Sequence, residues 1–204
     1  MALKPRGFRG LYAITPERLD RVEEALASGA LCALQYRNKS TNAARRLREA
    51  RRLARLCREH GVPFIVNDDV ELALAVEAAG VHLGREDEDL VAARARLPGR
   101  ILGASCYNRL DLAESAVAAG ADYVAFGSVF ASPTKPAAVR APLALFSRDL
   151  GVPKVAIGGI TLENAPLVVA AGADCVAVIT DLFDAPDVAA RARAYAKVFD
   201  HEIA

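Results

Sequence analysis

The sequence predicts an α/β fold, a single (β/α)8 TIM barrel that spans residues 1–204. Short apolar, β-branched runs alternate with longer amphipathic segments at a period of about 25 residues. Three helix-to-strand joints, at residues 77–81, 117–122 and 169–174, are near copies of one another. A doubly wound open sheet is the alternative architecture. It is the weaker one because no GxGxxG motif follows the first predicted strand.

Eight strands are predicted from the apolar runs. They cover residues 10–15, 31–37, 64–67, 81–83, 101–105, 123–126, 154–157 and 175–179. Most of these runs are apolar at consecutive positions, so both faces of each strand are expected to be buried. This is typical of parallel strands that are covered by helices.

The segments between the strands are rich in alanine and arginine, and their apolar residues recur at helical spacing. The clearest predicted helices cover residues 42–60, 70–79, 110–119 and 162–171. Asp69 is expected to cap the second of these helices. Glycines follow the helices and are expected to end them in the left-handed conformation: Gly61, Gly80, Gly120 and Gly172.

Composition narrows the class of protein. The chain is 53% hydrophobic and carries a net charge of +1, which gives no general attraction to nucleic acid or to a membrane. The basic run at residues 45–52 lacks interleaved aromatic residues and is interpreted as a solvated helix face. Cys32, Cys57, Cys106 and Cys175 show no metal-ligand spacing and are expected to be reduced. We therefore expect a cytoplasmic protein; a homo-oligomer is left open.

Polar residues gather where the predicted strands end, and barrel enzymes build their sites at that rim. Gln35, Arg37 and Lys39 alternate along one strand, so all three are expected on one face. Asp68 follows the next strand and Asp87 follows the one after it. The sequence therefore predicts a cup that holds a metal ion and a polyanion.

The two aspartates are predicted to bind Mg²⁺, which is usually held by few carboxylates together with phosphate and water. Arg37, Lys39 and Lys135 are predicted to neutralise phosphate oxygens, and Asn67 to donate to the same group. The alternative is that Arg37 and Lys39 simply form ion pairs with the two aspartates.

A second anion site is predicted from the last two strands. Residues 158–161, with the sequence GGIT, and the pair Ile179 and Thr180 follow strands and are expected to open helices. The proline-rich segment 128–140 is a candidate lid, in which Ser132, Thr134 and Lys135 are the polar groups.

No Ser-His-Asp or Cys-His set is present in the sequence. His82, the one histidine near the rim, is interpreted as a hydrogen-bonded wall residue rather than a base. The shortage of a general base favours chemistry driven by stabilisation of a leaving group.

The chain resembles thiamine phosphate synthases over nearly its whole length. The matching segments, in order, are LYAIT (11–15), QYRNK (35–39), IVNDD (65–69), GVHLGRED (80–87), GAS (103–105), FGSVF (126–130), PTK (133–135), AIGGI (156–160) and VAVIT (176–180). Arg85 departs from the family, which usually has glutamine there.

The resemblance implies a Mg²⁺-dependent enzyme that joins hydroxymethylpyrimidine diphosphate to a thiazole phosphate, giving thiamine phosphate and pyrophosphate. It implies that Gln35 and Ser105 contact the pyrimidine, and that Arg37, Lys39, Asn67 and Lys135 contact the diphosphate. It further implies that Asp68 and Asp87 bind the metal. The thiazole phosphate would be held by Ser132, Thr134, Gly159, Ile179 and Thr180.

Two rival functions fit the same fold. A thiazole tautomerase usually lacks the diphosphate and metal residues and has a catalytic histidine where this chain has Ser128. A non-catalytic protein that binds thiazole phosphate or thiamine phosphate would not need Asp68 and Asp87. The presence of both aspartates, together with Arg37 and Lys39, favours the transferase.

Overall fold

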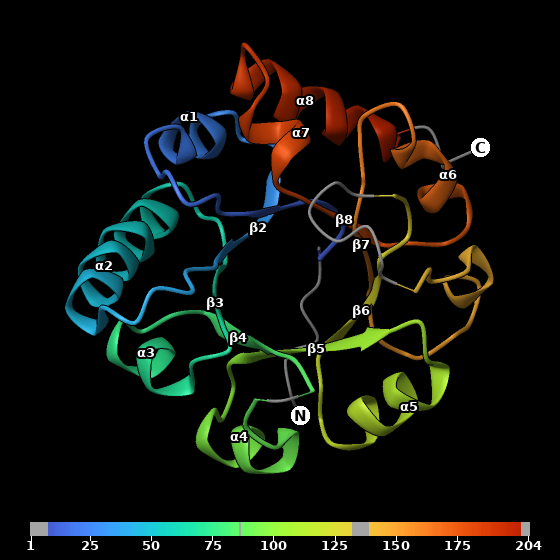
Figure 1. The fold of residues 1–204 in the computed structure, drawn as a ribbon, viewed down its shortest axis with the longest axis horizontal. Coiled ribbons are helices and arrows are strands. Elements are labelled where there is room, and N and C mark those ends of the chain that lie inside the picture. Colours follow the sequence, from blue (N-terminus) through green and yellow to red (C-terminus); the bar gives the residue numbers. More distant parts are fainter. Residues whose placement is uncertain (1–7, 86, 132–138, 201–204) are drawn as a thin grey trace.

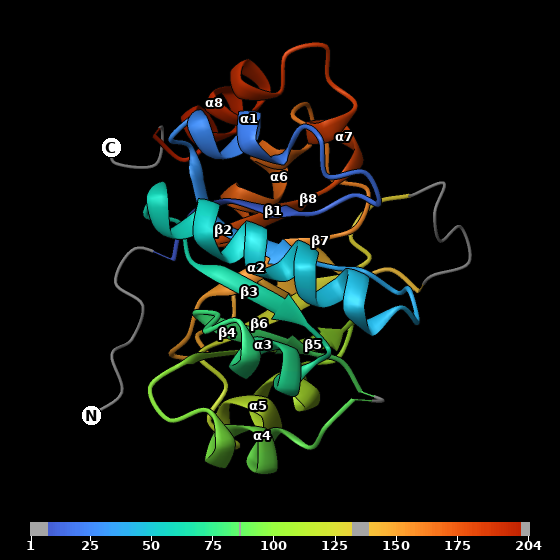
Figure 2. The ribbon, with the colours of Figure 1, turned by 90° about the vertical axis from the view of Figure 1, so that its left-hand side faces the viewer.

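The computed structural model describes residues 8–85, 87–131 and 139–200. In these residues, eight parallel strands form a closed barrel in which neighbours in sequence are neighbours in space and β8 closes on β1. The predicted barrel is therefore confirmed, and the open-sheet alternative is wrong. Helices surround the strands on the outside (Figures 1 and 2).

The strands have the following bounds: β1 Gly10–Ile14, β2 Leu31–Tyr36, β3 Phe64–Asn67, β4 Gly80–Leu83, β5 Ile101–Tyr107, β6 Tyr123–Gly127, β7 Lys154–Ile157 and β8 Cys175–Val178. The helices are α1 Val22–Ala27, α2 Ala43–Glu59, α3 Val70–Ala75, α4 Leu90–Arg96, α5 Leu110–Ala118, α6 Ala165–Ala170, α7 Thr180–Phe183 and α8 Val188–Val198. A short 3₁₀ helix, Leu143–Leu145, lies between β6 and β7.

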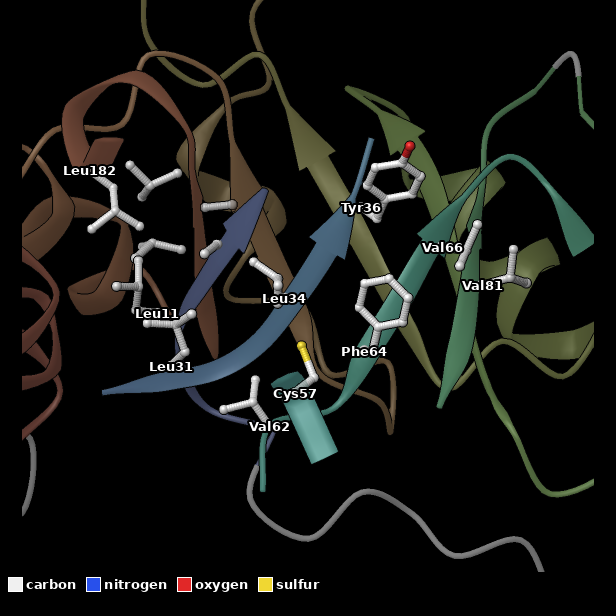
Figure 3. Close-up of a cluster of buried hydrophobic side chains, with 14 of the residues drawn as sticks. Leu11, Leu31, Leu34, Tyr36, Cys57, Val62, Phe64, Val66, Val81 and Leu182 are labelled. Atoms are coloured by element: carbon white, nitrogen blue, oxygen red, sulfur yellow. The ribbon is translucent and has the colours of Figure 1, made fainter. Parts of the chain in front are cut away.

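Two hydrophobic layers follow from the alternation of side chains along each strand. The outer layer lies between strands and helices and includes Leu34 of β2 and Cys57 of α2 (Figure 3). The inner layer fills the barrel and includes Phe8, whose ring stacks on Tyr123 with centroids 4.8 Å apart. Burial of apolar surface in both layers is the main force that closes the barrel.

Two of the three similar helix-to-strand joints make the same hydrogen bonds to a neighbouring strand. The backbone N–H of Asp122 donates to Leu102, and the Asp122 carboxylate accepts from the Leu102 N–H at 2.9 Å. Asp174 makes the matching pair of bonds with Lys154, whose N–H donates to its carboxylate at 2.8 Å. Each aspartate thus provides hydrogen-bond partners for a backbone N–H and a carbonyl at the start of the neighbouring strand. These bonds help to set the strand register.

Some predicted ends differ from the structure. Gly61, Gly120 and Gly172 have positive φ as expected, but Gly80 does not; it is the first residue of β4. A Cβ atom at Gly80 would lie 2.1 Å from the Ile101 carbonyl oxygen, so glycine is required there by close packing of two strands.

The helix predicted to reach residue 79 ends at Ala75, and the left-handed residue after it is Glu77, with φ of 52°. The helix predicted to begin at residue 162 begins at Ala165, so the GGIT segment forms a loop rather than the first turn. Asp69 caps α3 as predicted, because its side chain accepts from the Leu72 N–H.

The basic run lies on α2. Leu53 and Cys57 of this helix are buried, whereas Arg48, Arg51 and Arg52 are exposed, as expected of a solvated face. Cys175 is buried and Cys32 partly buried; both are free thiols. Within the described part of the chain, no helix is long and apolar enough to cross a membrane.

Candidate active site at the carboxyl ends of the strands

The described candidate residues share one rim, because the strands are parallel and their carboxyl ends meet there. They lie at or just after the strand ends: Gln35, Arg37 and Lys39 at β2; Asn67 and Asp68 at β3; Asp87 after β4; Ser105 in β5; Gly159 after β7; Ile179 and Thr180 after β8. Ser132, Thr134 and Lys135 lie outside the described residues.

Asp68 and Asp87 form a pair at the ends of adjacent strands, and each carboxyl group lies near enough to shift the pKa of the other. The Gly84 N–H donates to the Asp87 carboxylate at 2.6 Å, which fixes the loop after β4. The Asp68 N–H donates to the His82 carbonyl at 2.8 Å, and Asp68 has a positive φ of 64°. A left-handed, non-glycine residue costs conformational energy, and such residues concentrate at functional sites.

The two carboxyl groups differ in acidity. Burial raises the pKa of Asp87, and the hydrogen-bonded Asp68 carboxylate raises it further. Burial also acts to raise the pKa of Asp68, but the hydrogen bonds from Lys39 and Asp87 outweigh it and lower that pKa. Two close carboxylates repel each other, and a cation bound between them relieves that repulsion.

The donor set fits a hard divalent cation. Within residues 8–85, 87–131 and 139–200 no group of three or more His, Cys, Asp or Glu side chains could hold a metal. The two carboxylates suit Mg²⁺, which is usually held by few carboxylates and fills its remaining positions with phosphate and water.

Lys39 forms an ion pair with Asp68. The alternative prediction, that Arg37 and Lys39 pair with the two aspartates, is therefore confirmed for Lys39. The Lys39 side chain is 62% exposed, and an exposed pair of this kind is worth at most about 1 kcal/mol. Arg37 is also exposed and makes no ion pair in the part of the chain that the structure describes. Both cations can therefore turn toward an incoming anion at little cost.

A chain of hydrogen bonds crosses the interior of the barrel below the rim. Gln35 donates to the Tyr12 hydroxyl at 2.9 Å, and the Tyr12 and Tyr123 hydroxyls are 2.8 Å apart. The Tyr123 hydroxyl lies 2.9 Å from Nδ1 of His82, and Nε2 of His82 lies 2.8 Å from the Ser105 hydroxyl. Five strands thus hold Gln35 and Ser105 in fixed positions relative to each other.

His82 is buried, and burial lowers its pKa to about 4. It is neutral at physiological pH, and both ring nitrogens have partners, so it is the wall residue that the sequence predicted. Its ring stacks on Tyr123 with centroids 5.5 Å apart. Gly103 makes room for this stack, because a Cβ there would lie 2.0 Å from the Tyr123 ring.

The loop after β7 and the start of α7 are tied together beside the rim. Gly158 and Gly159 have φ of 98° and 65°, and the Asn164 amide donates to the Gly159 carbonyl at 2.9 Å. The Asp181 carboxylate accepts from the Leu162 N–H at 3.3 Å, and also from Arg191 and the Tyr195 hydroxyl. In the first turn of α7, the N–H groups of Leu182 and Phe183 donate to the Ile179 carbonyl at 3.2 and 3.0 Å.

A cavity of about 270 Å³ opens between the loop after β4 and α5, and its lining includes Asp87 and Ser105 but not Asp68. A larger cavity of about 430 Å³ lies between the loop after β1 and α7 and is lined by none of the predicted site residues. We assign the site to the rim because the carboxylates, cations and buried polar chain meet there.

Sequence reasoning missed three residues that shape the site. Tyr12 and Tyr123 lie in apolar runs and were not singled out, although a tyrosine buried in such a run needs a hydrogen-bond partner. Glu49 also went unnoticed; on α2 it accepts from Tyr36 and Asn38 at 2.8 Å each. Its position seven residues after the helix cap gave no signal.

Known proteins match this chain closely. The family model for thiamine monophosphate synthase matches residues 11–182. The thiamine-phosphate synthase of Aromatoleum aromaticum is 62% identical over 203 residues, covering 95% of this chain and 97% of that protein. The thiamine-phosphate synthase of Chromobacterium violaceum is 58% identical, covering 96% and 98%.

A solved structure agrees with the sequence relatives. The thiamine phosphate pyrophosphorylase of Pyrococcus furiosus has a TM-score of 0.86 and 36% identity, covering 98% of this chain and 99% of that one. Sequence and structure agree over nearly the whole length, and the chain belongs to the thiamine monophosphate synthase family.

Proposed function

We propose that this enzyme transfers the hydroxymethylpyrimidine group from its diphosphate to a thiazole phosphate, giving thiamine phosphate and pyrophosphate. The observation that carries the proposal is the meeting at one rim of the Asp68–Asp87 pair with the cations Arg37 and Lys39. A diphosphate with a bound divalent cation needs both kinds of group at once.

Each candidate residue has a proposed role. Asp68 and Asp87 would hold Mg²⁺, which when bound neutralises part of the charge on the departing diphosphate. Arg37, Lys39, Asn67 and Lys135 would contact the diphosphate oxygens. Gln35 and Ser105 would contact the edge of the pyrimidine. The thiazole phosphate would be bound by Ser132, Thr134, Gly159, Ile179 and Thr180.

The chemistry follows from charge stabilisation. The bond between the pyrimidine methylene carbon and the diphosphate oxygen breaks, and the diphosphate leaves with the electron pair. Arg37 and Lys39 stabilise the negative charge that develops on it. The thiazole nitrogen then attacks the pyrimidine-stabilised carbocation to form the new carbon–nitrogen bond. Neither step requires a strong base, which is compatible with a buried, neutral His82.

The rival tautomerase finds no support at Ser128. The Ser128 hydroxyl donates to the Phe130 carbonyl at 2.9 Å, and a serine engaged in this way does not act as a base. A tautomerase would also have no use for the acidic pair.

A turnover assay separates these functions. Purified protein with Mg²⁺, the pyrimidine diphosphate and the thiazole phosphate should form thiamine phosphate and pyrophosphate in equal amounts. Isomerised thiazole without pyrophosphate would indicate the tautomerase. Tight binding of either phosphate with no product would indicate the binding protein.

A further inference from the structure

Glu49 of α2 lies outside the barrel and yet is bonded to the loop that carries two of the proposed diphosphate contacts. Its Oε2 atom accepts from the Tyr36 hydroxyl and from Nδ2 of Asn38, both at 2.8 Å. Its Oε1 atom accepts from Nε of Arg45 at 2.7 Å. The Glu49 side chain is only 21% exposed, so these bonds form in a partly dehydrated environment where they are strengthened.

The residues that meet Glu49 alternate with the cations. Tyr36 and Asn38 turn toward α2, whereas Arg37 lies between them, and Lys39, next along the chain, reaches Asp68 at the rim. Because side chains of an extended segment alternate in direction, holding one set fixes where the other set points. Glu49 thus binds the side chains on one face of the segment, and the side chains on its other face are directed to the proposed diphosphate.

The same segment is anchored at its backbone. The Arg37 N–H donates to the Thr15 hydroxyl at 3.0 Å, and the Ser40 N–H donates to Oδ1 of Asn38 at 2.8 Å. The second bond orients the Asn38 amide, so its Nδ2 faces Glu49. Glu49 of α2 and Thr15, which follows β1, thus bond to the segment from two different elements.

We propose that Glu49 is a positioning residue for the transfer reaction, one that holds Arg37 and Lys39 in place for the diphosphate while touching no substrate itself. This inference rests on the proposed function. The hydrogen bonds, rather than the charge of Glu49, are the source of the effect, since both loop bonds go to one oxygen atom.

Glutamine at this position separates hydrogen bonding from charge. In Glu49→Gln the amide oxygen can still accept from Tyr36 and Asn38, and the variant loses only the ion pair with Arg45, whose side chain is 48% exposed. Glu49→Ala loses all three bonds. Glu59→Ala is the matched control, because Glu59 is on the same helix and its one ion pair among the described residues is an exposed pair with Arg55, at 3.7 Å.

The experiment is steady-state kinetics with each substrate varied in turn, supported by calorimetry of pyrophosphate binding in the presence of Mg²⁺. For Glu49→Ala we expect kcat/KM for the pyrimidine diphosphate to fall between about tenfold and a hundredfold, as for a small misplacement of catalytic groups. The KM for the thiazole phosphate should stay unchanged, and pyrophosphate should bind more weakly. The kcat/KM of Glu49→Gln for the pyrimidine diphosphate should lie within about threefold of the wild-type value. The kcat/KM of Glu59→Ala should equal the wild-type value.

The possible results are distinct. An active wild type with equal kinetics in Glu49→Ala would overturn the role of Glu49, and so would equal loss in the glutamine and alanine variants. A parallel rise of both KM values would indicate general damage to the fold and would also overturn it. A wild type that releases no pyrophosphate would overturn the proposed function and, with it, this inference.

Discussion

The carboxyl groups of Asp68 and Asp87 lie close together at the carboxyl ends of β3 and β4, near enough that each shifts the pKa of the other. Lys39 is bound to the Asp68 side of this pair and the Gly84 N–H to the Asp87 side. The pair is therefore held in place by groups on both sides, and its remaining oxygen lone pairs are suited to a divalent cation.

Removing one carboxylate charge should abolish metal-dependent turnover. We expect Asp68→Asn and Asp87→Asn each to lower kcat at saturating Mg²⁺ by at least about a hundredfold, because charge stabilisation of the leaving group is lost. Asp89→Asn is the control: Asp89 follows in the same loop but caps α4, and asparagine is an equally good cap. Full activity in either rim variant would contradict the assignment.

Removing a proposed diphosphate cation should slow bond cleavage. Arg37→Ala and Lys135→Ala are each expected to lower the single-turnover rate by about a hundredfold to a thousandfold, the range for loss of one preorganised donor. Rapid-quench measurement of pyrophosphate formation tests this directly. A normal single-turnover rate in both variants would refute the role of these cations.

His82 should make folding stability depend on pH. Its folded pKa of about 4 lies below the ordinary value of 6.5, so the unfolded chain takes up the proton first as pH falls. The stability contribution is complete above pH 6.5 and is lost as pH falls from there toward 4, by about 2 kcal/mol at pH 5. Urea unfolding of wild type and His82→Gln at pH 7.5 and pH 5 should show the smaller pH dependence in the variant. Equal dependence would show that His82 does not titrate in this way.

Asp181 should matter for the thiazole phosphate and not for the diphosphate. Asp181→Ala removes the link between the loop at Leu162 and helices α7 and α8, through Arg191 and Tyr195. We expect a loss of about 2 kcal/mol in unfolding free energy and a raised KM for the thiazole phosphate alone. Asp184→Asn, at the exposed end of α7, is the control. A raised KM for the diphosphate would show that the two anion sites are not separate.

The sequence was sufficient to predict the barrel and the rim that the described candidate residues share. Alternating apolar runs and helical segments give the order of elements, and parallel strands bring residues that follow different strands to one edge. Asp68 and Asp87 are 19 positions apart in the chain, yet each follows a strand by a few residues, which was enough to predict that they meet.

The interior chain could not be predicted in the same way. Tyr12 and Tyr123 are 111 positions apart and join only when β1 and β6 face each other across the closed barrel. The local pattern at Gly80 predicts a helix end, because glycine is typical there, whereas in the structure a neighbouring strand leaves no room for a Cβ. Close packing between strands is a tertiary property with no local signal.

The central claim is that the acidic pair and the two cations form one site for a metal-bound diphosphate. Isothermal titration of pyrophosphate into wild-type protein and Asp87→Asn, each with Mg²⁺ and with EDTA, tests it most directly. We predict that Mg²⁺ strengthens pyrophosphate binding to the wild type by at least about tenfold, or about 1.4 kcal/mol, and leaves binding to the variant unchanged. Equal affinity of the wild type with Mg²⁺ and with EDTA would contradict the claim.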